Sequence, residues 1–310
     1  MMTKNISTPD APANTDHTLL LRKGGWLPLS ADLHCHSSFS DGVLPPEILA
    51  ARAAQRGVDL WALTDHDEVS GIVAAQQAAK QHGMAFLAGA EISVTWLGRT
   101  VHIVGLGLDV QDSTLLAGLQ HTRSGRVNRA KGMSDALAKL GMPGTYDGAL
   151  KFVGNPELIS RTHFARHLVE AGHCASMQQV FDQYLHDDGP AYVDLQWAKL
   201  EEAVSWVQSA GGVAVIAHPG RYKYSSLEFD TLFKAFKAAG GLGIEVNTGS
   251  HRPHEFVQYA QVARDYGFLA SIGSDFHGPE DGVFDLGSIA PLAADLKPVW
   301  QELGHKILHA

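Results

Sequence analysis

Two histidines and an aspartate lie close together within residues 34–41. If this segment begins as a β-strand, His34 and His36 project from one face, because side chains alternate along a strand, and Cys35 points the other way. The polar residues that follow would turn the chain and return Asp41 toward the end of the strand. Two imidazoles and a carboxylate suit a borderline divalent cation that accepts nitrogen and oxygen. The alternative is an accidental His-x-His pair in a chain with 17 histidines.

Further residues of metal-ligating type lie at or just beyond other apolar segments. They are His66, Glu91, His102, His218, Asp275 and His277. One ion needs three or four ligands, so nine candidates in total indicate several ions. Any one of these histidines alone is more often a hydrogen-bonded structural residue. Their joint placement at strand ends is what predicts a metal centre.

The elements that would position these residues alternate between strands and helices. Short apolar runs predict strands at 31–36, 58–63, 84–90, 100–106, 213–217, 243–246 and 268–272. Helices are predicted at 45–57, 71–82, 199–210, 229–239 and 255–266. This alternation is typical of a β/α barrel or a wound parallel sheet, in which the reactive edge lies at the carboxyl ends of the strands.

One long segment interrupts this pattern and contains no convincing apolar strand. Within it, helices are predicted at 115–140, 161–171 and 177–185. We therefore expect a helical insertion that caps the substrate site at 111–190, a catalytic barrel made of 28–110 and 191–310, and a flexible N-terminal tail at 1–27.

Composition narrows the class of protein. A formal net charge of -9 argues against a broad basic surface for duplex DNA, but not against a small anionic substrate held by a few arginines and metal ions. Cys35 and Cys174 are the only cysteines, which predicts no disulfide framework and fits a reducing cytoplasm. No signal peptide or membrane span is recognisable. The sequence thus predicts a cytoplasmic protein without a membrane partner, and it leaves the oligomeric state open.

The order of the candidate ligands resembles that of the polymerase and histidinol phosphatase (PHP) family. The matching motifs are His34-x-His36 with Asp41, Thr64-Asp65-His66, Glu91, His102, Ala217-His218-Pro219 and Asp275-x-His277. The resemblance implies an α/β fold, a distorted (β/α)7 barrel, with three divalent ions at the carboxyl ends of its strands. Manganese, zinc and iron all suit this donor set, and the sequence does not choose among them.

The resemblance also implies how the ions are shared. One would take His34, His36, Glu91 and Asp275, a second would share Glu91 and add His102 and His218, and the third would take Asp41, His66 and His277. Catalytic roles are accordingly expected for Glu91, His218, Asp275 and His277. A hydroxide held between the ions would be the nucleophile, and the ions would neutralise charge on the phosphoryl oxygens.

The insertion resembles a small bacterial branch of the family, in segments 159–166, 184–185 and 189–193. That branch includes a phosphatase that removes the 3′-phosphate of nucleoside 3′,5′-bisphosphates and a 5′-to-3′ exoribonuclease for short RNA. The resemblance implies either or both activities here. The alternatives are a histidinol phosphate phosphatase, a binding module without turnover and an accessory domain of a DNA polymerase. The complete set of predicted ligands argues against a binding module without turnover. The absence of polymerase sequence argues against an accessory domain of a DNA polymerase.

Arginines of the insertion are the predicted ligands of a second phosphate, because a planar guanidinium pairs bidentately with phosphate oxygens. Arg161 is the first choice, since it lies in the first turn of a predicted helix. Arg123, Arg126 and Arg129 recur at three-residue spacing and could share a basic face toward the site. A solvated helix face explains this trio equally well. His163 is expected either to contact substrate or to orient a loop.

Several other residues have expected structural or repulsive roles. Asp187 and Asp188 stand where related sequences often have lysine or arginine, and they would repel an anionic substrate unless they point outward. Core positions are expected for Trp61, Phe86 and Phe268. His251 and His254 are expected on the surface of a loop, and Glu245 is expected to be a hydrogen-bonding partner.

Overall fold

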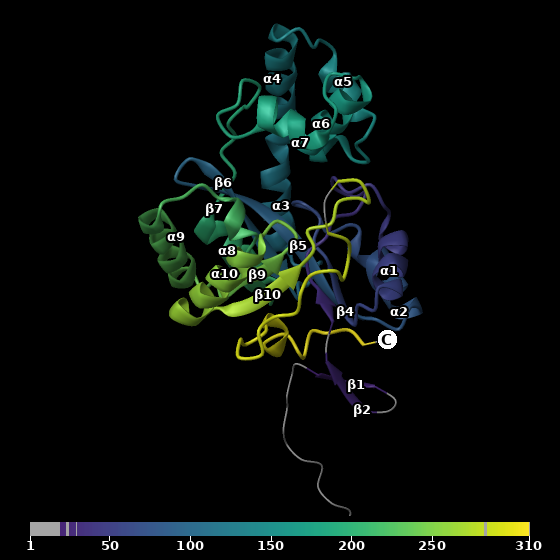
Figure 1. The fold of residues 1–310 in the computed structure, drawn as a ribbon, viewed down its shortest axis with the longest axis vertical. Helices are drawn as coiled ribbons and strands as arrows, with labels where there is room; N and C mark the ends of the chain where they lie inside the picture. Colours follow the sequence, from purple (N-terminus) through teal and green to yellow (C-terminus); the bar gives the residue numbers. More distant parts are fainter. Residues whose placement is uncertain (1–18, 23–24, 29, 282–283, 310) are drawn as a thin grey trace, which may run out of the picture.

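A computed structural model of the chain describes residues 19–22, 25–28, 30–281 and 284–309 (Figure 1). The first 18 residues of the expected tail lie outside the described residues. The part that follows forms a two-stranded antiparallel sheet of β1 (Leu19–Arg22) and β2 (Gly25–Pro28). No helix of the described part combines the length and apolar character that crossing a membrane requires.

Seven strands form the central sheet, in the spatial order β10-β9-β8-β6-β5-β4-β3. They are β3 (Ala31–Asp32), β4 (Leu60–Leu63), β5 (Ala85–Trp96), β6 (Arg99–Leu106), β8 (Val213–Ile216), β9 (Gly243–Thr248) and β10 (Leu269–Gly273). The short β7 (Ala198–Lys199) pairs with β5 beside this path. Backbone hydrogen bonds from Leu33 to Ile272 and from Asp275 to His34 bring the edge strands together. The sheet is thereby a nearly closed barrel, as the sequence predicts.

Helices cover the outside of this barrel. They are α1 (Pro46–Gln55), α2 (Ile72–Gln81), α8 (Leu200–Ser209), α9 (Ser226–Ala238) and α10 (Pro253–Tyr266). Alternate strand residues point to opposite faces. In β4, Leu60 and Ala62 pack inside the barrel, whereas Trp61 and Leu63 pack against the helices. The expected core positions of Trp61, Phe86 and Phe268 are confirmed, because all three are buried.

The largest difference from the predicted strands concerns β5 and β6. The strand expected to finish at Glu91 continues to Trp96, so Glu91 lies in mid-strand. The chain then turns at Leu97 and Gly98, whose φ angles are 46° and 74°, into β6, which runs antiparallel to β5. Two positive φ values give a turn that matches the twist of a hairpin. Because β6 is also antiparallel to β8, it is the strand that distorts the otherwise parallel barrel.

The helical insertion extends beyond one end of the barrel (Figure 1). Its elements are α3 (Ser113–Ser124), α4 (Arg126–Lys139), α5 (Thr145–Leu150), η1 (Pro156–Leu158), α6 (Arg161–Glu170), α7 (Met177–Val180) and the π-helix η2 (Phe181–Leu185). The single helix predicted at 115–140 is therefore two helices. They are interrupted at Gly125, where a β-carbon would lie 2.7 Å from the Leu195 side chain.

The two halves of the insertion belong to different cores. Leu115 and Leu119 of α3 pack into the core of the barrel. From α4 onward, apolar side chains form a cluster of their own, which includes Met133, Leu137 and Phe164. We call residues 126–185, from α4 to η2, the cap.

Candidate active site

All nine predicted ligands converge at one rim of the barrel. Their ligand atoms form four groups in which every atom lies within 4.8 Å of the others. The groups are His36 with Asp41, His66 and His277; His34 with His36 and Asp275; His34 with Glu91 and His218; and His66 with Glu91 and His102. Each group combines imidazole nitrogen with at least one carboxylate oxygen. Such mixed sets could hold zinc, manganese or iron.

Glu91 lies at the centre of these groups and is fully buried. Its Oε1 atom is 2.9 Å from His102 Nδ1 and 2.8 Å from His218 Nε2. Its Oε2 atom is 3.0 Å from His66 Nδ1 and 3.3 Å from His36 Nε2. Burial alone would raise the pKa of Glu91, but the surrounding imidazoles, with His102 foremost, hold it well below its usual value. The carboxylate is therefore ionised, and its two oxygens face different imidazole pairs.

Buried oxygens without hydrogen-bond partners test whether the rim suits metal ions. Asp41 Oδ1, Glu91 Oε2 and Asp275 Oδ1 are all buried and have no such partner among the described residues. An unsatisfied buried acceptor is costly, and it calls for a specific reason. These three oxygens lie beside imidazole nitrogens at the same rim, as in His277 Nε2 to Asp41 Oδ1 at 3.3 Å. The rim therefore fits divalent cations.

A polar turn returns Asp41 to the rim, as the sequence predicts. Asp65 holds this turn by accepting hydrogen bonds from Ser37 N at 2.7 Å, Ser37 Oγ at 2.6 Å and Ser40 Oγ at 2.5 Å. The strand expected at 31–36 is shorter, since β3 ends at Asp32. His34 and His36 nevertheless both face the site, because their Nε2 atoms lie 3.5 and 3.3 Å from Asp275 Oδ1.

The Glu245 carboxylate in β9 contacts two of the predicted metal ligands, His34 and His218. Its Oε1 atom is 2.7 Å from His34 Nδ1, and its Oε2 atom accepts the backbone N–H of His218 at 2.6 Å. Burial opposes protonation of His34, yet the carboxylates around it, with Glu245 foremost, raise its pKa well above the usual value. A carboxylate on one ring nitrogen leaves the other free to ligate a metal. The prediction that Glu245 is a hydrogen-bonding partner is confirmed.

Strained backbone accompanies two of the predicted ligands. His218 and Asp275 have φ angles of 25° and 55°, which residues other than glycine rarely adopt. Such conformations persist only where the surroundings enforce them, and they concentrate at functional sites.

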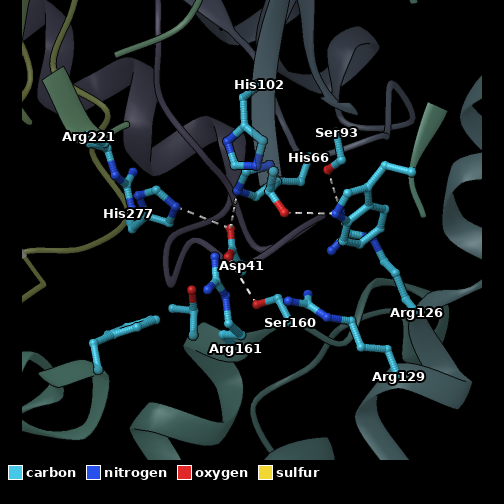
Figure 2. A pocket seen from close by; sticks show the side chains of 14 residues that line it. Asp41, His66, Ser93, His102, Arg126, Arg129, Ser160, Arg161, Arg221 and His277 are labelled. Atoms are coloured by element: carbon cyan, nitrogen blue, oxygen red, sulfur yellow. Dashed lines mark hydrogen bonds and ion pairs between the residues drawn. The ribbon is translucent and has the colours of Figure 1, made fainter. Parts of the chain in front are cut away.

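A pocket that is partly open to solvent lies between the rim and the cap (Figure 2). The barrel side of its lining consists of Asp41, His66, Ser93, Thr100, His102, Trp197, Arg221 and His277. The cap side consists of Arg126, Arg129, Ser160, Arg161, Thr162 and Phe181.

Two arginines of α4 line the pocket beside Trp197. The guanidiniums of Arg126 and Arg129 lie 4.8 and 5.3 Å from the centre of the Trp197 ring. Arg126 also pairs with the carboxylate of Asp67. Burial, together with the positive charges of Arg161 and Arg126, lowers the pKa of Arg129 to about 9. An anion bound here would relieve that accumulation of positive charge.

Arg161, the first residue of α6, lines the same pocket and is already paired. Its Nη1 atom donates to Leu185 O at 3.1 Å and to Asp187 Oδ1 at 2.9 Å. Asp187 therefore points toward this guanidinium instead of away from it. Arg123 is not among the pocket residues, because it donates to Asp67 O at 2.6 Å. The predicted trio of arginines thus divides, with two members in the pocket and one outside it.

A family model described as PHP domain matches residues 32–249, which is more than half of the chain. The chain belongs to the PHP family.

Three similar proteins place it within that family. A 3′,5′-nucleoside bisphosphate phosphatase from Chromobacterium violaceum is 49% identical over 277 residues, 89% of this chain and 97% of the relative. A 5′-3′ exoribonuclease from Haemophilus influenzae is 40% identical over 271 residues, 87% of this chain and 98% of the relative. A solved structure of an amidohydrolase from Chromobacterium violaceum superposes with a TM-score of 0.87 at 48% identity, covering 90% and 98% of the two chains.

Two histidines of this PHP protein are buried outside the described pocket lining. His163 is fully buried and is not among the pocket residues; its Nδ1 accepts the N–H of Ser160 at 3.0 Å, where α6 begins. Of its two expected roles, this geometry matches the orienting one. His251 is also buried, with Nε2 accepting the N–H of Gly220 at 2.9 Å, so its expected surface position is wrong. His254 is exposed, as expected.

Sequence reasoning missed two of the residues that line this PHP pocket from opposite sides. Arg221 lies on the barrel side, with Nη1 3.1 Å from Asp275 Oδ2. Its place three residues after His218 is the one signal that could have marked it. Phe181 lies on the cap side, at the start of a π-helix, and nothing in its sequence context distinguishes it from a core residue.

Proposed function

We propose that this chain is a metal-dependent phosphoesterase that hydrolyses the 3′-phosphate of nucleoside 3′,5′-bisphosphates, the 3′-phosphodiester of short 5′-phosphorylated oligonucleotides, or both. The observation that carries the proposal is the pocket itself, because metal-ligating side chains and cap guanidiniums line its two sides. A substrate with two phosphate groups would engage both sides at once. The names of the bacterial relatives support the same substrates.

Metal ions would be held by the nine residues of the rim. We propose three divalent ions of manganese, zinc or iron, shared as the family resemblance implies, with Glu91 between two of them. Bound there, they would lower the pKa of water and withdraw charge from the phosphoryl oxygens. Arg221, beside Asp275, adds a positive charge from the chain itself on the barrel side.

The cap would bind the 5′-phosphate through Arg126, Arg129 and Arg161. Guanidiniums pair with phosphate oxygens in a planar, bidentate manner, which orients the substrate as well as attracting it. With the 5′ end held there, water attacks the phosphorus at the rim and the bond between phosphorus and O3′ breaks. The products are a nucleoside 5′-phosphate and either inorganic phosphate or a shortened 5′-phosphorylated oligonucleotide.

Histidinol phosphate is the alternative substrate. It carries a single phosphate, so the cap arginines would have no phosphate to bind when that group lies at the rim. A binding module without turnover would not need all nine ligands at one rim. The two free cysteines are consistent with the predicted cytoplasmic location.

The test compares three substrates in the presence of manganese. They are adenosine 3′,5′-bisphosphate, a 5′-phosphorylated diribonucleotide and histidinol phosphate, each assayed with and without a chelator. We expect release of inorganic phosphate from the first, of mononucleotide from the second, or both, and loss of either activity with the chelator. Turnover of histidinol phosphate alone would overturn the substrate assignment, and chelator-resistant turnover would overturn the metal dependence.

A further inference from the structure

Phe181 places an aromatic side chain in a pocket whose lining is otherwise mainly polar. It is half-buried, and it packs against the apolar cluster of the cap. A polar catalytic pocket gains nothing from a phenyl ring unless part of the ligand is apolar. In a nucleotide, the part with an apolar face is the base.

Guanidiniums already lie over the two other aromatic rings near the cap arginines. Arg126 and Arg129 lie over Trp197, and Arg129 and Arg161 lie 5.7 and 5.9 Å from the centre of the Tyr192 ring. Among the aromatic side chains that line the pocket in the described part of the chain, Phe181 is the one without such a cover. Because Phe181 is half-buried and lines the pocket, part of its side chain faces the space that a ligand would occupy.

The segment that carries this ring also holds a predicted phosphate ligand. Phe181 is the first residue of η2, and Leu185, the last, accepts a hydrogen bond from Arg161 Nη1 at 3.1 Å. π-Helices are rare, and those that occur are frequently found at functional sites. One short segment thus connects an aromatic surface with a guanidinium. In a nucleotide, the base and the 5′-phosphate are likewise connected through one sugar.

We propose that Phe181 is the platform on which the nucleobase of the substrate stacks. The inference rests on the proposed function and deepens it. Among the described residues, the pocket lining includes hydroxyl groups but no side-chain amide, and its single carboxylate there, Asp41, is a candidate metal ligand. Paired hydrogen bonds to adenine use a side-chain amide and those to cytosine a carboxylate, whereas the cap arginines, which could read guanine, are assigned here to the 5′-phosphate. Stacking is tolerant of sequence because every base has a π-face, so the site accepts purines and pyrimidines alike.

The experiment compares a nucleotide with the same molecule lacking its base. Phe181→Ala is assayed with adenosine 3′,5′-bisphosphate and with ribose 3,5-bisphosphate. We expect its KM for the nucleotide to rise about tenfold with little change in kcat, and its KM for ribose 3,5-bisphosphate to stay at the wild-type value. Phe181→Trp restores the nucleotide KM, because it restores an aromatic face. An unchanged nucleotide KM, or an equal rise for both substrates, would overturn the proposal.

Two further variants separate stacking from cap structure. Phe181→Leu keeps an apolar side chain against the cap core but removes the ring, so it repeats the selective loss if Phe181→Ala folds poorly. Phe152→Ala alters another half-buried phenylalanine of the cap, one that is not among the pocket residues, and it leaves both KM values unchanged. Wild-type enzyme that turns over neither nucleotide nor oligonucleotide would instead contradict the proposed function. Wild-type turnover without a selective effect at Phe181 contradicts this inference alone.

Discussion

The rim of the barrel and the cap face the same pocket but hold their polar side chains differently. At the rim, Asp41, Glu91 and Asp275 each keep one buried oxygen without a hydrogen-bond partner. On the cap, Arg126 and Arg161 already pair with carboxylates, and Arg129 donates to a backbone carbonyl at 2.9 Å. The rim is therefore organised to hold a cation among its own side chains. The cap is organised to bind an anion that displaces partners which its arginines already have.

The sharpest test of the rim is Glu91→Ala. Its two oxygens face different imidazole pairs, so its loss removes the proposed bridge between two ions. We expect kcat to fall by about a thousandfold or more, with bound metal reduced, as measured by steady-state assay and elemental analysis. Glu201→Ala, which alters an exposed carboxylate of α8, should leave both unchanged. Near-normal activity with a full metal complement would remove Glu91 from the site.

A smaller effect at the rim is expected from Glu245→Gln. This carboxylate does not face the pocket but orients His34 and accepts the N–H of His218. Replacing such an outer partner typically weakens metal binding by about 10- to 100-fold. Activity should therefore fall at low manganese and recover at high manganese. A loss that added metal does not reverse would mean that Glu245 acts in another way.

The comparison is tested on the cap by Arg161→Ala. A charge-assisted hydrogen bond contributes about 1.5 to 3 kcal/mol, so KM for adenosine 3′,5′-bisphosphate should rise by about ten- to a hundredfold. KM for adenosine 3′-phosphate, which lacks the 5′-phosphate, should change little. Arg123→Ala is the matched control, because Arg123 is an arginine of the insertion that does not line the pocket. Equal losses for both substrates would show that Arg161 does not recognise the 5′-phosphate.

The two regions also differ in how far sequence could predict them. The candidate ligands at the rim are of the types that metal chemistry requires, so His34, Asp41 and the others could be proposed from type and spacing alone. The hairpin of β5 and β6 was missed because Glu91 resembles the end of a buried strand. The alternation of Ser93 and Thr95 with apolar neighbours, which continues the strand, gives a much weaker pattern.

For the insertion, the sequence could identify candidate phosphate-binding arginines but not which of their side chains point into the pocket. Arg123 and Arg126 are three residues apart, yet Gly125 separates the helices that carry them, and only the second lines the pocket. The direction in which each points depends on tertiary partners such as Asp67. For the same reason, the turn of Asp187 toward Arg161 could not be derived from local pattern.

A substitution at Asp187 has the smallest expected effect, and it tests directly whether the cap arginines exchange partners on binding. If cap arginines exchange partners on binding, its half-exposed carboxylate competes with the substrate phosphate for Arg161. Asp187→Asn should therefore lower KM for adenosine 3′,5′-bisphosphate. The change should be at most about fivefold, because an exposed ion pair contributes about 0 to 1 kcal/mol, and it should shrink as salt is added. Asp188→Asn removes the same charge from the next residue, which has no ion pair with Arg161 among the described contacts. Equal changes in the two variants would indicate a general charge effect, whereas a raised KM in Asp187→Asn alone would show that this carboxylate holds Arg161 in place for the phosphate.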